Sequence, residues 1–181
     1  MGRENEIVFI DSSVLISCGR RENARFRALA REASRRDTVF RIPPSVYAEV
    51  STDPAVDAYT TTESPVDEAV QEGWMTVTDS PSYVDSDVSS VMDQARSFIA
   101  SASNRSEDLV ETADAQIVGL ALESLRADTT DGITVVTNDI PLGEAVASLI
   151  PRYGFDNQQV TWCTGEEFAP ELGEDFVSEF D

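Results

Sequence analysis

Short runs of apolar residues alternate along the chain with longer segments in which apolar residues recur at helical spacing. The runs predict β-strands at residues 6–10, 38–42, 74–78, 133–137 and 159–163. The longer segments predict α-helices at residues 22–36, 45–53, 65–73, 88–102, 107–126 and 141–150. Since strands and helices alternate, we expect an α/β fold with a parallel sheet covered by helices on both faces.

A length of 181 residues suits one compact domain. We expect a single domain over residues 1–181, with a longer helical and loop section at 55–105 and an acidic tail at 165–181. No apolar run approaches the roughly 20 residues that a membrane-spanning helix needs, and the N-terminus lacks the apolar core of a signal peptide. The two cysteines lie far apart and have no metal-binding spacing. These features predict a cytoplasmic protein without a membrane partner.

The charge balance is extreme, with 34 acidic residues against 13 basic residues and a formal net charge of −21. Every basic residue is Arg, and the chain contains no Lys and no His. Such a surface repels itself in dilute buffer, which favours a salt-accumulating halophile over a mesophile as its source. The missing residue types exclude P-loops, Schiff-base enzymes, Ser-His-Asp triads and imidazole zinc sites. Catalysis is left to carboxylates, hydroxyls, Arg, Cys or a bound metal ion.

Eight of the 13 Arg residues lie within residues 20–41, where only three acidic residues occur. One interpretation is a basic surface that binds RNA phosphates, with Arg20, Arg21 and Arg25 as contacts. A second is a solvated helix face whose arginine stems cover apolar surface. A third is a contact with an acidic protein partner. The residues alone do not decide among the three.

Four acidic residues stand where a fold of this class places its active site. Asp11 and Asp139 each follow a strand, in EIVFI-D and ITVVTN-D, so both lie at the edge where open α/β sheets bind ligands. Glu49 lies one turn into the helix after the second strand. Asp114 lies two turns into the predicted helix 107–126, between buried positions. A buried carboxylate needs a partner, and without Lys and His the simplest partner is a metal ion.

Each of these acids also has an ordinary structural role that competes with the site hypothesis. Asp11 could cap the turn after its strand, and Asp139 could be the N-cap of the helix that follows it. Glu49 and Asp114 could be surface carboxylates on a very acidic protein. Glu111 lies one turn before Asp114 and is a candidate extra ligand, in competition with the same surface role.

The segments around the four acids resemble the four motifs of PIN domains. FIDSSVLI resembles the first motif, an Asp at a strand end followed by small hydroxyl residues and an aliphatic pair. IPPSVYAEV resembles the second, ADAQIVGLAL is similar to the third, and VVTNDIPL, with a hydroxyl residue two positions before an Asp, resembles the fourth. The motifs occur in family order over residues 6–163, so together they are fairly specific. The longer section at 55–105 departs from the smallest family members.

The resemblance implies a single PIN-like domain with three α/β/α layers and a parallel sheet of about five strands in the order 3-2-1-4-5. It implies Mg²⁺ or Mn²⁺ as the cofactor, since both prefer oxygen ligands, and single-stranded RNA as the substrate. The metal-binding and catalytic residues would be Asp11, Glu49, Asp114 and Asp139. The residues that support these ligands by hydrogen bonds would be Ser12 or Ser13 and Thr137 or Asn138.

These features predict a metal-dependent endoribonuclease. A VapC-type toxin with an antitoxin partner and an RNA-processing nuclease fit the residues equally well, and the resemblance also implies a homodimer. The alternative is a non-catalytic PIN-like module that binds RNA or protein. Metal-dependent cleavage of RNA that is lost in Asp11→Asn and Asp139→Asn distinguishes the enzyme from the module.

Overall fold

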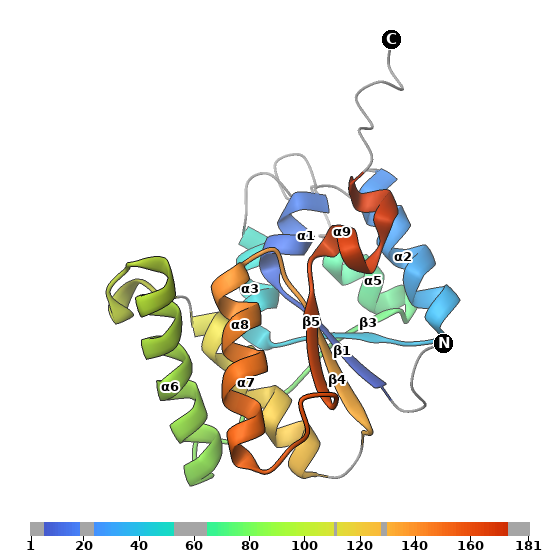
Figure 1. Cartoon of the computed structure of the whole chain (residues 1–181). Helices are drawn as coiled ribbons and strands as arrows, with labels where there is room; N and C mark the ends of the chain where they lie inside the picture. The colour runs from blue at the N-terminus through green and yellow to red at the C-terminus, as the bar shows by residue number, and fades with distance from the viewer. Residues whose placement is uncertain (1–5, 19–23, 53–64, 111, 128–129, 174–181) are drawn as a thin grey trace.

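The computed structural model describes residues 6–18, 24–52, 65–110, 112–127 and 130–173. Within these residues lies a sheet of five parallel strands in the order β3-β2-β1-β4-β5 (Figure 1). The strands are β1 (Glu6–Ile10), β2 (Phe40–Ile42), β3 (Met75–Val77), β4 (Gly132–Val136) and β5 (Val160–Cys163). The predicted parallel sheet and its order 3-2-1-4-5 are confirmed.

Helices connect the strands and close the fold. The α-helices are α1 (Ser12–Cys18), α2 (Ala24–Arg36), α3 (Pro44–Thr52), α5 (Pro65–Glu72), α6 (Ser86–Ser103), α7 (Thr112–Arg126), α8 (Ile140–Leu149) and α9 (Gly165–Phe168). Short 3₁₀ helices are η1 (Glu107–Leu109), η2 (Ile150–Tyr153) and η3 (Pro170–Gly173). None of the described helices combines the length and the apolar character that crossing a membrane requires.

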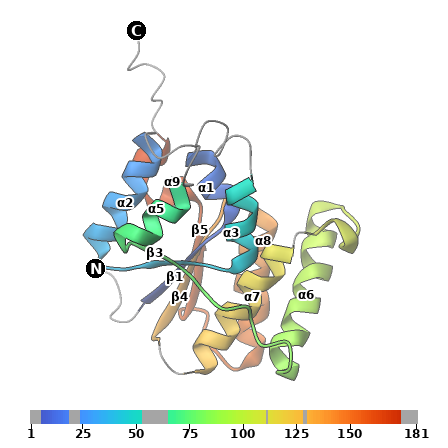
Figure 2. The same cartoon turned by 180° about the vertical axis from the view of Figure 1, so that it is seen from behind.

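The helices cover the sheet on both faces, which gives the three layers that the resemblance implied (Figures 1 and 2). On one face α7 packs beside α3 and α8, and α6 packs against α7 and α8 from outside. On the other face α2 and α9 approach the sheet through aromatic rings. The ring centroids of Phe26 and Trp74 are 5.3 Å apart, and those of Phe168 and Phe40 are 5.4 Å apart.

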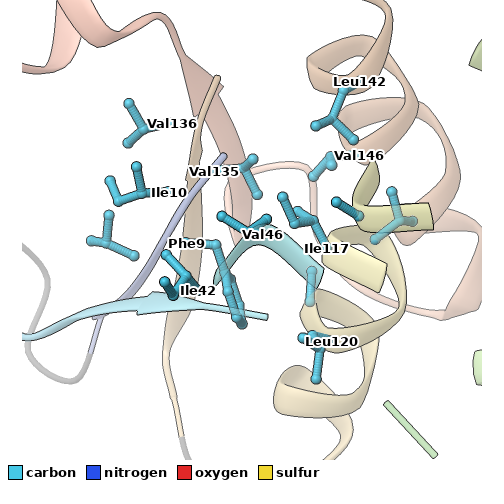
Figure 3. Close-up of a cluster of buried hydrophobic side chains, with 14 of the residues drawn as sticks. Phe9, Ile10, Ile42, Val46, Ile117, Leu120, Val135, Val136, Leu142 and Val146 are labelled. Carbon is cyan, nitrogen blue, oxygen red and sulfur yellow. The ribbon is translucent and has the colours of Figure 1, made fainter. Parts of the chain in front are cut away.

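The core forms where β1 and β4 meet the helices of the first face. Phe9 and Val135 point from these strands toward Val46 of α3 and Ile117 of α7 (Figure 3). All four side chains are at most 1% exposed. The near-continuous apolar runs of β1 and β4 thus reflect strands that are buried on both faces.

The pairing of β1 with β4 spans both strands completely. Glu6 lies opposite Gly132 at one end, and Ile10 lies opposite Val136 at the other. Because the strands are parallel and in register, their carboxyl ends finish side by side at one edge of the sheet. Residues that follow Ile10 and Val136 are therefore brought together by the sheet itself.

The prediction of one continuous helix over residues 107–126 is wrong. The 3₁₀ helix η1 ends at Leu109, Val110 has an extended backbone (φ −77°, ψ 128°), and α7 begins at Thr112. Val110 is nevertheless buried, so the helical spacing of apolar residues continues across the break and conceals it. As a result, Asp114 lies in the first turn of α7 and not two turns into a longer helix.

Much of the acidic C-terminal segment 165–181 folds onto the domain. A capping box between Thr164 and Glu167 begins α9, and Phe168 at its end is only 3% exposed. Residues 174–181 lie outside the described part of the chain. In the longer section at 55–105, the described residues form α5, β3 and α6.

A glycine allows α8 to lie directly against β5. A Cβ atom at Gly143 would lie 2.1 Å from Cδ2 of the Trp162 ring, far inside van der Waals contact. Gly119 in α7 offers a comparison, because a Cβ there would lie 2.8 Å from Cγ and Sδ of Met92. Met92 can move these atoms by changing rotamer, whereas the indole ring of Trp162 moves only as a rigid unit.

We expect Gly143→Ala to lower the free energy of unfolding by about 1–3 kcal/mol or more, because the added methyl group overpacks the α8–β5 contact. Gly119→Ala gains the same helix propensity and should cost clearly less. Urea unfolding in concentrated KCl, followed by circular dichroism, measures both. Equal losses in the two variants would contradict the close packing of Trp162 on α8.

Candidate acidic site at the carboxyl ends of the strands

Asp11 directly follows β1, and its side chain is buried at 2% exposure. Its backbone amide donates to the Val136 carbonyl at 3.0 Å, which holds the residue at the end of the β1–β4 pair. Its Oδ2 atom accepts hydrogen bonds from the hydroxyls of Ser13 at 2.7 Å and Thr137 at 2.8 Å. Its Oδ1 atom is buried and accepts no hydrogen bond from the described residues. One carboxylate oxygen is therefore fixed, and the other is left for a ligand.

Thr137 connects Asp11 to Asp139 through hydrogen bonds. The residue follows β4 and is completely buried. Its hydroxyl donates to Asp11 and accepts the backbone amide of Asp139 at 3.0 Å. Ser13 acts similarly, because its hydroxyl donates to Asp11 and accepts the backbone amide of Asn138 at 3.1 Å. Two hydroxyls thus connect the ends of β1 and β4.

Asp139 is the N-cap of α8, with an extended backbone and a side chain that accepts the Leu142 amide at 3.4 Å. The capping role that competed with the site hypothesis is therefore real. This role uses Oδ1 and leaves the second oxygen of the half-buried carboxylate for another ligand, so capping and cation binding are compatible.

The electrostatic environment disfavours a charge on Asp11. Burial raises the pKa of its carboxyl above the ordinary value of 3.8. Hydrogen bonds from Ser13, Thr137 and the Ser12 backbone lower this pKa, and the neighbouring charge of Asp139 raises it further. The net direction is upward, so a proton or a cation stabilises this carboxylate.

The other two predicted acids come from neighbouring helices. Asp114 is 4% exposed in the first turn of α7, where the helix dipole favours a negative charge. Glu49 is half-buried in the second turn of α3. The helix α3, which carries Glu49, packs against α1, the helix that follows β1, and against α7, which carries Asp114.

Among the residues that the structure describes, no three acidic or cysteine side chains come close enough to hold a metal ion. Asp11 and Asp139 are the pair that the sheet brings together, and the convergence of all four acids is not seen. Mg²⁺ in proteins is often held by one or two carboxylates, with water and substrate phosphate completing its ligands. The buried, unpartnered Oδ1 of Asp11 beside Asp139 fits such a site.

Comparison with known proteins identifies the family. A family model described as the halobacterial PIN domain matches residues 4–177. The chain belongs to this family. No curated protein and no solved structure matches it. PIN domains are generally nucleases that hydrolyse phosphodiester bonds, and they usually use divalent metal ions.

The remaining predicted residues occupy different positions in this PIN domain. Ser12 begins α1 and contributes through its backbone. Asn138 is exposed, and its side-chain oxygen accepts the Gly165 amide at 3.0 Å rather than serving an acid. Arg25 is half-buried on α2 beside Cys18, where burial raises the thiol pKa to about 12 and the Arg25 charge acts in the opposite direction. The candidates outside the described residues are Glu111, Arg20 and Arg21.

Three arginines of α2 make ion pairs within the protein. Arg31 pairs with Glu171 of η3, and Arg35 and Arg36 both pair with Glu32. Glu32 is 5% exposed, so its two partners offset the cost of burying a carboxylate. These pairs favour a structural role for this part of the basic segment.

Gln116 is a residue of the PIN domain that the sequence analysis did not single out. It is buried in α7 two positions after Asp114, accepts the Ser45 hydroxyl of α3, and donates to the Tyr83 hydroxyl at 2.8 Å. It thereby ties the helix of Glu49 to the helix of Asp114. A polar residue within the apolar run ADAQIVGLAL was the available signal.

We expect the stability of the metal-free protein, relative to that of Asp11→Asn, to fall as the pH rises. The pKa of Asp11 is raised on folding, so its stabilising contribution is complete below the ordinary value of 3.8 and is lost as the pH rises through the folded-state pKa. Asn does not titrate. Urea unfolding of both proteins in EDTA, from below pH 3.8 upward through the folded-state pKa, measures the difference in their free energies of unfolding. A difference that does not change with pH would contradict a raised pKa of Asp11.

Proposed function

We propose that this PIN domain is an endoribonuclease that hydrolyses phosphodiester bonds in single-stranded RNA with Mg²⁺ or Mn²⁺. The observation that carries the proposal is the buried Asp11 carboxylate, which has one oxygen fixed by two hydroxyls and the other without a partner, beside Asp139. This arrangement costs free energy unless a cation or a proton is supplied. This edge of the sheet, at the carboxyl ends of the strands, is also where open α/β folds bind their ligands.

Asp11 and Asp139 would hold the cation directly. Asp114 and Glu49, on the mutually packed helices α7 and α3, would complete the site through water or direct contact once RNA is bound. Ser13 and Thr137 orient Asp11 from one side and leave Oδ1 free for the ion. When bound, the metal ion would lower the pKa of a water molecule and neutralise charge on the phosphate.

The composition supports a reaction that depends on a metal ion. The chain contains no His and no Lys, so neither of these common general bases is available. An RNA substrate must also approach a protein with a net charge of −21. In molar salt the screening length is about 3 Å, so this repulsion acts only at direct contact. High salt is therefore the condition in which the RNA phosphates can approach the acidic site with little electrostatic repulsion.

We expect Asp11→Asn and Asp139→Asn each to reduce cleavage of an unstructured RNA oligonucleotide by about 100-fold or more, since even residues that only support metal ligands cost 10- to 100-fold. Asp93→Asn, an exposed acid of α6, changes the net charge equally and should cleave normally. The assay uses end-labelled RNA in concentrated KCl with Mn²⁺, and EDTA should abolish the product. Cleavage that survives EDTA or both site substitutions would refute the proposal.

A second expectation concerns stability. Mn²⁺ should raise the melting temperature of the wild-type protein, because a ligand at 100 times its Kd adds about 2.7 kcal/mol to the free energy of unfolding. Asp11→Asn should lose this shift, whereas Asp93→Asn should keep it. Thermal scans in constant KCl with increasing Mn²⁺ provide the measurement. An identical shift in the wild type and Asp11→Asn would place the ion elsewhere.

The competing function is a non-catalytic module that binds RNA or protein. The absence of a three-acid cluster among the described residues favours it. RNA that binds to the wild type without being cleaved at any concentration of Mg²⁺ or Mn²⁺ would establish this alternative.

The biological setting is a further part of the proposal. A toxin would co-purify with a small antitoxin that suppresses its cleavage of RNA, and an RNA-processing nuclease would act without one. Light scattering of the purified chain tests the proposed homodimer. The same samples serve the cleavage assay, so the oligomeric state and the activity can be compared directly.

A further inference from the structure

The C-terminal segment, defined here as residues 164–173, touches the loop that carries Asp139. The Gly165 amide, at the start of α9, donates to Oδ1 of Asn138 at 3.0 Å. Gly165 is buried, and a Cβ atom there would lie 3.2 Å from Cγ1 of Val14 and 3.5 Å from Asn138 Oδ1. The start of α9 is therefore seated on both chain segments that leave the ends of β1 and β4.

The Asn138 side chain accepts a hydrogen bond from the Gly165 amide, which the capping box of α9 leaves without a partner. The first amides of a helix lack partners within it. The Thr164 hydroxyl accepts the Glu167 amide at 3.2 Å, and the Glu167 carboxylate accepts the Thr164 amide at 3.1 Å. This capping box does not serve the Gly165 amide, which is buried and uses Asn138 instead.

The far part of the C-terminal segment is anchored to α2 and β2. Phe168 is buried, with its ring centroid 5.4 Å from that of Phe40. The Arg36 guanidinium lies 4.2 Å from the Phe168 ring centroid, and Arg31 pairs with Glu171. A planar guanidinium can stack on a ring while it also pairs with a carboxylate, which an ammonium group does less well. The buried Phe168 thus fixes the segment as a support for the loop, whereas the exposed Arg31–Glu171 pair contributes little.

The loop that carries Asp139 is short and relies on few contacts. The Thr137 amide donates to the Cys163 carbonyl at 2.9 Å, the Asn138 amide to the Ser13 hydroxyl, and the Asp139 amide to the Thr137 hydroxyl. Each of these contacts is made by the backbone of the loop. The hydrogen bond that the Gly165 amide donates to the Asn138 side chain joins this loop to the C-terminal segment.

We propose that Asn138 is a positioning residue, which holds Asp139 at the acidic site by tying its loop to the C-terminal segment. This inference rests on the proposed function insofar as it concerns metal binding and cleavage. It assigns Asn138 a role different from the sequence-based expectation, in which its side chain would serve an acidic ligand. It also makes the start of α9, at Gly165, part of the framework of the site.

The test compares three variants of the full chain. Asn138→Ala removes the acceptor for the Gly165 amide. Asn138→Asp keeps an acceptor oxygen and should restore the contact. Glu171→Ala loosens the same segment at its far end without touching the loop, and it is the matched control.

Hydrogen exchange in EDTA is the first measurement, because it depends on neither metal nor RNA. In Asn138→Ala, the amides of Gly165 and Asp139 should exchange at least about 10-fold faster than in the wild type. Asn138→Asp should exchange like the wild type. Glu171→Ala should leave the Asp139 amide unchanged. If the Asp139 amide of Asn138→Ala exchanged at the same rate as in the wild type, the proposal would be overturned.

Mn²⁺ affinity, measured by electron paramagnetic resonance, is the second measurement. Asn138→Ala should bind Mn²⁺ about 10-fold more weakly, and neither Asn138→Asp nor Glu171→Ala should bind it more weakly than the wild type. Unchanged affinity in Asn138→Ala would refute a role in positioning a metal ligand. If the wild type neither binds Mn²⁺ nor cleaves RNA, the proposed function fails, and the exchange result alone decides whether Asn138 holds the loop.

Discussion

The hydrogen bond from the Asp11 amide to the Val136 carbonyl extends the β1–β4 ladder one residue past the strands. It places Asp11 beside Thr137, whose buried hydroxyl is shared between the Asp11 carboxylate and the Asp139 amide. Every contact of the acidic site between β1 and β4 depends on the strand register that places Ile10 opposite Val136. In a buried setting, a network of so few polar groups depends strongly on each member, because a lost partner cannot be replaced by bulk water.

The centre of this arrangement could be predicted from the sequence because its strands are buried on both faces. EIVFI and ITVVT are nearly continuous apolar runs, and such runs are typical of the middle of a parallel sheet. Once these strands are recognised, Asp11 and Asp139 follow at their carboxyl ends. The hydroxyl residues Ser13 and Thr137 lie within two positions of these acids, so a supporting role was also visible in the sequence.

The rest of the site depends on geometry that residue spacing does not contain. Val110 has an extended backbone that interrupts the helix, but it is buried and fits the helical spacing of apolar residues. The sequence therefore did not show that Asp114 lies in the first turn of a helix. The distance of Glu49 from the strand ends depends on how α3 packs against α1 and α7. The direction of the Asn138 side chain depends on α9, which lies in a segment that the sequence indicated only as an acidic tail.

Asp11 and the hydroxyl donor Thr137 are 126 positions apart in the chain. During synthesis, β1 is made first, and its full-length partner β4 leaves the ribosome only after β2, β3 and the intervening helices. Contacts over such separations form late, and a domain folds as a unit when its last essential strand is present. A nascent chain therefore carries only one half of the acidic edge for most of its synthesis. For the proposed ribonuclease, this order of assembly would keep incomplete chains inert beside the messenger that encodes them.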